Sequence, residues 1–376
     1  MPRRSKIPRV PSAPRTTQCG NNRARGRLGT LAFFASTQIT PGSGQRSHEM
    51  AAITGKKILV VGASGFLGRP LTARLAAAGA KICAVCRNPP KAGAANVFWS
   101  RGDAGDANHI QEMFSSFRPA IVFHLTSDSQ GGRALSLIPG SLQNDLMATV
   151  NVLHGAASAD TKVEQFVMAA TFEEPDGAEP TPVSPYAAAK WAATGYGRMF
   201  RQHYGLDVRI VRPMMTFGPG QKEFKVVPST ILSLLRDQHA TIGSGSRLVD
   251  WVYVDDVVEG LIAAACVPHL PSEVDLGSGV LVSVADMARE IARQLGREHL
   301  LKIGNGARGE EVVRVGDAYT ARRLLDFKAK TPLPEGVART VAYYRSLLGL
   351  STSIAGGRSS PPQTITNNAP ITRSFG

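Results

Sequence analysis

The segment KKILVVGASGFLG, residues 56–68, constrains the fold more than any other part of the chain. A short apolar run ends at Gly62, and Gly65 and Gly68 follow as a helical pattern begins. Glycines at this spacing allow a tight turn, a close approach to a pyrophosphate and close packing of helix on strand. The positive end of the helix dipole then faces the phosphates. The segment predicts a dinucleotide site formed by Gly62, Gly65, Phe66, Leu67 and Gly68.

Apolar runs and helical patterns alternate from residue 56 to about residue 213. The expected strands cover residues 56–62, 81–86, 95–100, 119–126, 163–170 and 206–213, and the expected helices cover residues 66–80, 106–117, 141–159 and a stretch from Ser184. Continuous apolar strands separated by helices are typical of a parallel sheet covered on both faces. The pattern therefore predicts an α/β fold, a Rossmann-type doubly wound parallel sheet.

The alternation changes after about residue 218. Helical patterns are expected over residues 226–238, 254–267, 283–296 and 336–349, with strands over 248–254 and near 272–278. We interpret residues 56–218 as a nucleotide-binding Rossmann domain and residues 219–350 as a smaller substrate-binding α/β domain, partly interleaved with the sheet.

Both ends of the chain are low in complexity. Residues 1–48 contain nine basic residues and no acidic one, which accounts for much of the net charge of +14. This composition predicts disorder for residues 1–55, and a Ser-, Pro- and Gly-rich composition predicts it for 351–376. The basic segment is compatible with an organelle transit peptide, with a nucleic-acid-binding arm, or with an assigned start upstream of a true start at Met50. We favour the last of these and expect no nucleic-acid partner.

Four cysteines in 376 residues suit a reducing compartment, so we expect a cytoplasmic protein, or an organellar one if the transit peptide is genuine. No apolar run near the N-terminus reaches the length of a membrane span, and we expect no membrane association. Cys83 and Cys86 form a C-x-x-C pair. They lie in an apolar strand pattern, where an offset of three places the side chains on opposite faces. We therefore expect buried strand residues and no metal site.

The end of the second expected strand bears on the choice of cofactor. An NAD site usually offers Asp or Glu there, whereas this chain has Arg87. An Arg suits a 2′-phosphate, so we expect NADP(H) in preference to NAD(H). The alternative is that Arg87 is only a solvated loop residue. Asp103, after the third strand, is predicted either to contact the adenine or to serve in capping the next helix.

The stretch SPYAAAK, residues 184–190, carries the expected chemistry. Ser184 and Pro185 are typical of the first positions of a helix, and Tyr186 and Lys190 then share one helical face. A nearby ammonium and an oxidised nicotinamide favour the phenolate, so we expect a lowered pKa for Tyr186 and a role as general acid and base.

Several motifs occur in a consistent order over roughly residues 56–348. They are VGASGFLG, VFHLT, NDLMATVNVL, the Tyr186–Lys190 pair, RPMMTFGPG, DWVYVDDVVEG, DLGSG and RGEEVVRVGDAYTARRLLDF. The chain resembles the extended short-chain dehydrogenase/reductase family, in its nucleotide-sugar epimerase/dehydratase/reductase branch.

This resemblance implies further site residues. Thr171 matches the catalytic Ser or Thr that hydrogen-bonds the sugar oxygen, and Lys190 also binds the nicotinamide ribose. Leu125 and Pro213, in two of the shared motifs, are expected against the cofactor. Asn144 matches an Asn near the active site, unless it is only a polar residue satisfied within its helix.

The chain departs from the family at two places. Val249 stands where many members have an Arg that grips the nucleotide diphosphate, so Arg247 or Arg308 is expected to take that role. Phe172 replaces the Asp of a Thr-Asp-Glu motif found in 4,6-dehydratases, although Glu173 remains available to a substrate.

These features predict an enzyme that acts at C4 of a nucleotide sugar. A 4-keto sugar reductase with Tyr186 as general acid is favoured by the NADP-type strand. The alternative is a nucleotide-sugar 4-epimerase with tightly bound cofactor, followed by a 4,6-dehydratase and a non-catalytic NADP-binding protein. The resemblance also implies a homodimer formed through the helix that carries Tyr186 and the helix before it.

Overall fold

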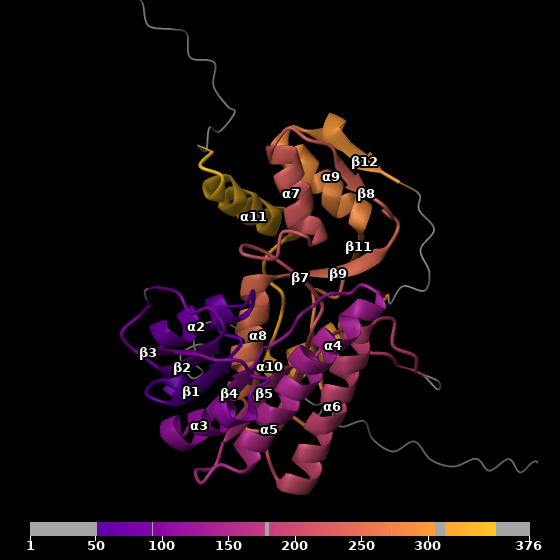
Figure 1. Cartoon of the computed structure of the whole chain (residues 1–376). Coiled ribbons are helices and arrows are strands. Elements are labelled where there is room, and N and C mark those ends of the chain that lie inside the picture. The colour runs from indigo at the N-terminus through magenta and orange to yellow at the C-terminus, as the bar shows by residue number, and fades with distance from the viewer. Residues whose placement is uncertain (1–50, 92, 177–179, 272, 305–312, 351–376) are drawn as a thin grey trace, which may run out of the picture. The chain divides into compact units, whose positions relative to one another are not determined.

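The computed structural model describes residues 51–350 except 92, 177–179, 272 and 305–312, and all described residues fall in one compact unit. A seven-stranded sheet has the order β10-β6-β5-β4-β1-β2-β3, with every pair parallel (Figure 1). Its strands are β1 (Lys57–Val61), β2 (Lys81–Cys86), β3 (Val97–Arg101), β4 (Ile121–His124), β5 (Gln165–Ala169), β6 (Val208–Pro213) and β10 (Val274–Leu276). The predicted doubly wound Rossmann fold is confirmed.

Helices cover both faces of this sheet because its strands are apolar on both faces. On one face lie α2 (Gly68–Ala77), α8 (Val254–Cys266) and α10 (Ala318–Leu325), packed on Ile58, Val60 and their neighbours. On the other face lie α3 (Ala107–Phe117), α5 (Ala148–Ala157) and α6 (Pro185–Tyr204), packed on Leu59 and Val61. Cys83 is buried on the second face and Cys86 is also buried, as predicted for strand residues.

The segment before α5 is less regular than the predicted single helix over residues 141–159. A 3₁₀ turn (Leu135–Leu137) and the short α4 (Ile138–Ser141) lead into a π-helical turn (Leu142–Met147), which then continues into α5. Such turns add one residue to a helix and re-aim the side chains that follow. Here the turn contains Asn144 and the fully buried Asp145.

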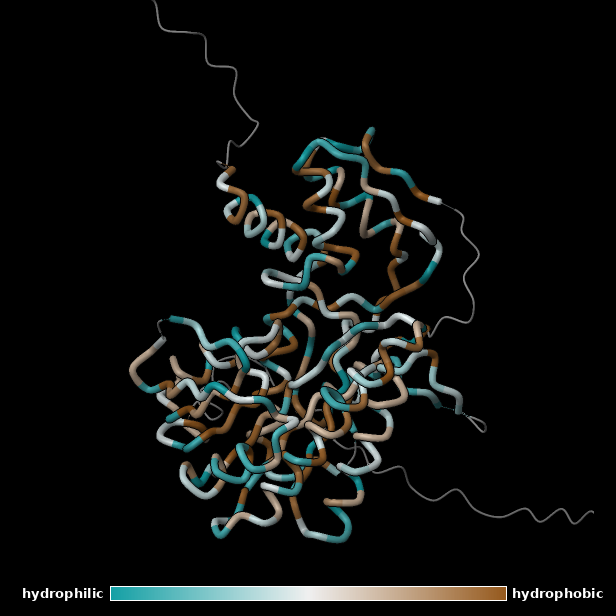
Figure 2. Tube along the Cα trace, in the orientation of Figure 1, coloured by the Kyte–Doolittle hydropathy of each residue, from teal (hydrophilic) through white to brown (hydrophobic). Residues whose placement is uncertain are grey.

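The C-terminal part forms a separate hydrophobic cluster next to the sheet. It contains a three-stranded sheet of β11 (Leu281–Ser283), β9 (Leu248–Tyr253) and β7 (Met215–Phe217), and a pair formed by β12 (Leu301–Ile303) and β8 (Ala240–Ile242). Around them pack α7 (Val226–Leu235), α9 (Val284–Leu295), a 3₁₀ turn (Glu298–Leu300) and α11 (Leu333–Leu347). In Figure 2, hydrophobic and hydrophilic residues alternate along α11, as expected for a helix with one buried face.

Segments beyond residue 218 contribute to both parts of the molecule, since α8, α10 and β10 pack with the seven-stranded sheet. The division at residue 218 stays a prediction. Of the predicted disordered tails, residues 1–50 and 351–376 lie outside the described residues, whereas residues 51–55 are ordered and Ile53 is fully buried in the core. Within the described part of the chain, no helix is both long enough and apolar enough to cross a bilayer.

Candidate active site

The turn between β1 and α2 forms a cradle at the carboxyl edge of the sheet. Gly62 has a φ of 89°, and a Cβ there would lie 2.9 Å from the backbone nitrogen of Thr126. A Cβ on Gly68 would lie 2.1 Å from the Gly62 carbonyl oxygen, so α2 packs directly on the turn. No side chain caps α2 and its first turn contains no acid, so no side-chain carboxylate competes with a phosphate for the positive end of the helix. The cradle therefore fits a dinucleotide.

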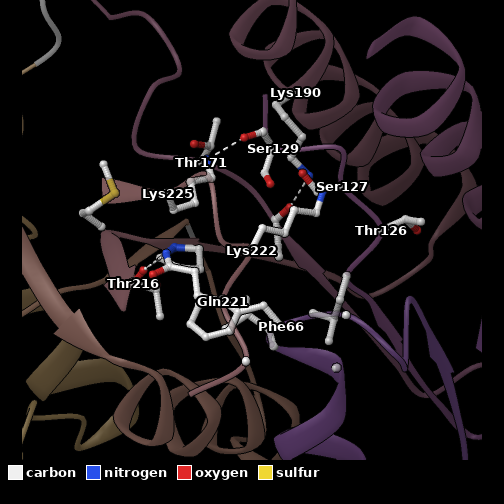
Figure 3. Close-up of a pocket in the computed structure, with 18 of the residues that line it drawn as sticks. Phe66, Thr126, Ser127, Ser129, Thr171, Lys190, Thr216, Gln221, Lys222 and Lys225 are labelled. Carbon is white, nitrogen blue, oxygen red and sulfur yellow. Dashed lines mark hydrogen bonds between the residues drawn. The ribbon is translucent and has the colours of Figure 1, made fainter. Parts of the chain in front are cut away.

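A cavity of about 390 Å³ adjoins this cradle, at the point where the strand order reverses between β1 and β4. Ligands of doubly wound sheets bind at such a switch point. Segments that follow β1, β4, β5 and β6 line the cavity together with the loop before α7 (Figure 3). Ten residues predicted from the sequence are among the lining residues: Gly65, Phe66, Leu67, Gly68, Leu125, Thr171, Glu173, Tyr186, Lys190 and Pro213.

Helix α6 places the Tyr–Lys pair at this cavity. The Ser184 hydroxyl accepts a hydrogen bond from the Ala187 amide at 3.1 Å, and Pro185 occupies the first turn, so α6 begins as predicted. Tyr186 and Lys190 then lie one turn apart. The Lys190 ammonium is buried and donates to the Ala169 carbonyl oxygen at 2.5 Å, which ties α6 to the end of β5.

The side chains around Tyr186 affect its pKa, which the sequence predicts to be lowered. Burial raises the pKa of Tyr186 above its ordinary value, and the negative charges of Glu173 and Asp145 act in the same direction. The hydroxyls of Thr171 and Ser127 oppose this rise. The groups of this chain therefore raise the pKa of Tyr186, and the predicted lowering, which also depends on the charge of an oxidised nicotinamide, stays a prediction. Lys190 is turned toward Ala169 and toward the acids Asp145 and Glu174, which hold up its own pKa against the larger lowering by burial.

Thr171 is held at the end of β5 by two acidic neighbours in sequence. Its amide donates to Glu174 at 3.2 Å, and its hydroxyl accepts from the amide of Glu173 at 3.3 Å. Glu174 is buried and also accepts from the Thr194 hydroxyl of α6 at 2.9 Å. This arrangement holds the Thr171 hydroxyl beside Tyr186, so that both hydroxyls can reach one substrate oxygen.

The comparisons with known proteins agree with this geometry. The model of the "NAD dependent epimerase/dehydratase family" matches residues 58–272. The chain belongs to this family. It is an enzyme, and the family's nucleotide-sugar epimerases and dehydratases depend on NAD.

Relatives in the family cover most of the described chain. The UDP-glucose 4-epimerase of Mycolicibacterium smegmatis is 29% identical over 315 residues, which cover 77% of this chain and 99% of that protein. The structure of MoeE5 in complex with UDP-glucuronic acid and NAD is 27% identical, with a TM-score of 0.69 over 77% of this chain and 99% of that one. The UDP-glucose 4-epimerase of Thermotoga maritima with UDP-glucose has a TM-score of 0.69 at 23% identity over 78% of this chain and 99% of that one, and supports the fold.

Two lysines that line the cavity, Lys222 and Lys225, were not predicted from the sequence. Lys222 donates to the Asp128 carbonyl oxygen at 2.9 Å. Lys225 donates to the Ser129 carbonyl oxygen at 2.5 Å (Figure 3). They connect the loop before α7 to the loop after β4 and bring positive charge to the cavity wall. In the sequence, Lys222 and Lys225 lie on either side of Phe224, just before a predicted helix. This pattern does not indicate which loop the two lysines contact.

Ser127 and Asp145 were also missed. Ser127 lines the cavity after β4, and Asp145 lies beneath it on the π-helical turn, within the electrostatic reach of Lys190 and Tyr186. Asn144, which the resemblance selected, is half-buried and does not line the cavity. Asp145 is the only acidic residue of the helix predicted over residues 141–159, and this was the available signal.

The other predicted residues do not line the cavity beside the glycine turn. Arg87 is exposed after β2, and Asp103 accepts from the Gly105 amide at 2.8 Å while Asp106 caps α3. Arg247 lines a second cavity of about 260 Å³ between α7 and β9. Arg308 lies outside the described residues, and Arg314 of the same motif binds the loop after β5 through the Phe172 carbonyl oxygen and Asp176.

Proposed function

We propose that this enzyme is a nucleotide-sugar 4-epimerase, which oxidises C4 of a bound sugar and reduces it again from the other side. The observation that carries the proposal is the shared cavity, which brings Thr171, Tyr186 and Lys190 next to the uncapped start of α2. The similarity to a UDP-glucose 4-epimerase over almost its whole length supports a uridine diphosphate sugar as substrate. A retained nicotinamide would accept the hydride from C4 and return it.

The residues of this chain then have distinct roles. Tyr186 exchanges a proton with the C4 oxygen, and the Thr171 hydroxyl donates to that oxygen as negative charge develops on it. Lys190 adds a positive charge beneath the site. Lys225 lies within the electrostatic reach of Glu173, so these two side chains form a polar wall suited to sugar hydroxyls. Arg247, in the adjoining cavity, is assigned to the diphosphate.

Product analysis tests this proposal. The purified protein is incubated with UDP-glucose without added cofactor, and the anomeric sugar signals are followed by NMR. The proposal expects conversion to UDP-galactose until the two sugars reach equilibrium. Absence of conversion with UDP-glucose and with UDP-glucuronic acid, in protein that holds its cofactor, would contradict it.

The exposed Arg87 at the end of β2 favours a second candidate, a 4-keto sugar reductase that consumes NADPH. If Arg87 binds a 2′-phosphate, Arg87→Ala weakens NADPH binding at least about tenfold and leaves NADH binding unchanged. Arg118, which follows α3 at the other end of the sheet, provides the control substitution Arg118→Ala. Equal effects of Arg87→Ala on both cofactors, measured by calorimetry, would remove the reason for this candidate.

A 4,6-dehydratase reaction, in which the sugar loses water, is less well supported by the site. Phe172 occupies the position of the expected acid, is buried in the core cluster and lines the cavity, so it supplies no proton to a leaving water. Glu173 alone remains as an acid at this end of β5 that lines the cavity.

We also propose that the enzyme forms a homodimer through the face that carries α4, the π-helical turn and α6. Large apolar side chains are exposed there, with Leu135 at 81%, Leu142 at 47% and Met147 at 45%. A groove of about 550 Å³ between α4 and α6 is lined largely by apolar side chains, including Ile138, Leu142 and Leu146. Apolar patches of this kind are typical of subunit interfaces.

A further inference from the structure

Glu174 is a buried acid that follows β5, and the proposed reaction does not use it. Its exposed fraction is 2%, and it does not line the cavity, whereas its neighbour Glu173 does. A buried carboxylate destabilises a fold unless hydrogen bonds and a nearby cation compensate for the water that it loses. The groups that compensate Glu174 therefore indicate what this side chain contributes to the site.

One oxygen of Glu174 connects the end of β5 to α6. Its Oε1 accepts hydrogen bonds from the Thr171 amide at 3.2 Å and from the Thr194 hydroxyl at 2.9 Å. A carboxylate oxygen has two acceptor positions, so both bonds form at once. Thr194 is 0% exposed, and solvent therefore does not compete for its hydroxyl. The position of Thr171 thus depends on α6 through a single carboxylate.

Thr194 belongs to a row of residues on α6 that are spaced by one helical turn. The row consists of Tyr186, Lys190, Thr194 and Arg198. Residues four apart lie above one another on a helix. Lys190 donates to the Ala169 carbonyl oxygen of β5, and Arg198 donates through Nε to Glu273, just before β10, at 2.6 Å. Three successive turns of α6 are therefore fastened to residues at the sheet, directly after the turn that carries Tyr186.

Arg212 of β6 supplies the positive charge beside Glu174. Its Nη2 lies 3.7 Å from Glu174 Oε2. The same guanidinium donates to Asp275 at 2.8 Å and to Glu273, which is also the partner of Arg198. These charges connect β6, β10 and α6 behind the loop that follows β5. The carboxylate of Glu174 is therefore held by an ion pair in addition to its two hydrogen bonds.

We infer that Glu174 and Thr194 are positioning residues for the reaction. By fixing α6 to the end of β5, they set the distance between the Thr171 hydroxyl and the Tyr186 hydroxyl. The inference rests on the proposed function, in which both hydroxyls contact the C4 oxygen of the sugar. Displacement of a reacting group by about 1 Å can lower a rate about 100-fold. Neither Glu174 nor Thr194 lines the cavity, so their loss should act on the chemical step and leave binding nearly unchanged.

Kinetics of Thr194 variants with UDP-glucose test this role. Thr194→Val removes the hydroxyl and keeps the size of the side chain, so it should lower kcat about tenfold with little change in KM. Thr194→Ser keeps the hydroxyl and should retain most of the wild-type kcat. Thr340→Val of α11 is the matched control, because the Thr340 hydroxyl is also buried and donates one bond, to the Gly336 carbonyl oxygen at 2.7 Å. A wild-type kcat in Thr194→Val, or an equally large loss of kcat in Thr340→Val, would overturn the positioning role.

Two substitutions of Glu174 separate its hydrogen bonds from its charge. Glu174→Gln keeps an oxygen that accepts from Thr171 and Thr194, and Arg212 keeps its other two carboxylates, so most of kcat should remain. Glu174→Leu removes the acceptor and should lower kcat about 100-fold with KM nearly unchanged. Thermal unfolding shows whether the Leu variant folds, and the Thr194 variants decide the question if it does not. A kcat for folded Glu174→Leu as high as that for Glu174→Gln would contradict the inference.

Hydrogen exchange of the Thr171 amide tests the connection without any sugar. In the wild type this amide is bonded to Glu174, so its exchange with solvent, measured by NMR, should be slow. Thr194→Val should accelerate the exchange about tenfold, because the carboxylate loses its second partner, whereas Thr340→Val should leave it unchanged. An unchanged exchange rate in Thr194→Val would show that Thr171 does not depend on α6. If the wild type does not turn over UDP-glucose, the proposed function is at fault, and the exchange of the Thr171 amide still decides the connection.

Discussion

At the scale of single residues, the central pair is Thr171 and Tyr186. Both residues line one cavity, and burial raises the pKa of Tyr186. We predict that Tyr186→Phe lowers kcat about 10²- to 10⁴-fold while the affinity for the cofactor is unchanged, since only the transferable proton is removed. Tyr204→Phe, at the exposed end of the same helix, is the matched control. Parallel loss of cofactor affinity, measured by calorimetry, would show that Tyr186 is a binding residue.

His124 leads to a prediction about acid stability. Its side chain is 0% exposed, and burial lowers its pKa from 6.5 to about 3. The unfolded chain therefore binds a proton between these pH values that the folded chain does not bind. Stability should be complete above about pH 6.5 and should decrease as the pH falls toward 3, by up to about 1.4 kcal/mol for each pH unit.

The variant His124→Asn removes this titration. Urea unfolding between pH 7 and pH 4 should show a smaller decrease in the free energy of unfolding for His124→Asn than for the wild type, with the exposed His203→Asn as control. If the free energy of unfolding changes equally with pH in the wild type and in His124→Asn, this account is contradicted.

At the scale of secondary-structure elements, α8 shows how the C-terminal half is fixed to the sheet. Arg209 of β6 is fully buried and donates to the carbonyl oxygens of Ala264 at 2.7 Å and Val267 at 2.7 Å, at the end of α8. The Asp207 carboxylate accepts from the same guanidinium at 2.7 Å. A cation at a helix C-terminus also interacts favourably with the helix dipole.

We predict that Arg209→Ala lowers the free energy of unfolding by about 3 kcal/mol or more, because several buried carbonyl groups lose their donor. Arg198→Ala removes a more exposed arginine that pairs with Glu273, and should cost less than about 1 kcal/mol. Guanidinium denaturation of both variants measures the difference. A cost for Arg209→Ala no larger than that for Arg198→Ala would show that α8 is held mainly by its apolar contacts.

The irregular helix before α5 marks a limit of prediction from sequence. The apolar spacing over residues 141–159 predicts one helix and cannot reveal a π-helical turn, since the inserted residue changes hydrogen bonding and leaves the composition unchanged. That turn decides that Asp145 faces the site and Asn144 does not. By contrast, Ser184 and Pro185 were sufficient to predict where α6 begins, because a cap depends on local hydrogen bonds.

At the scale of the whole molecule, the doubly wound sheet was predictable because its apolar strands and glycine turn are local features. The short strands β7, β8, β11 and β12 were missed, whereas the equally short β10 falls within the strand expected near residues 272–278. Lys222 and Lys225 reach the cavity only through long-range packing. No local pattern contains that information.

The proposed dimer can be tested at this scale. Leu142→Glu places a charge on the apolar face between α4 and α6 and should convert the dimer to a monomer in sedimentation analysis. Leu248→Glu, at a comparably exposed leucine on β9, should leave the dimer intact. A monomeric wild type, or a dimer that Leu142→Glu leaves unchanged, would place the interface elsewhere or remove it.

The central claim is that this enzyme oxidises and then reduces its substrate with one retained cofactor. The most direct measurement is to denature the purified protein and identify any released nicotinamide dinucleotide by mass spectrometry. The proposal predicts close to one NAD(H) or NADP(H) per chain. Protein that is purified empty and binds added NADPH would contradict it, since the cofactor would then be a consumed substrate and a keto-sugar reductase would be the better assignment.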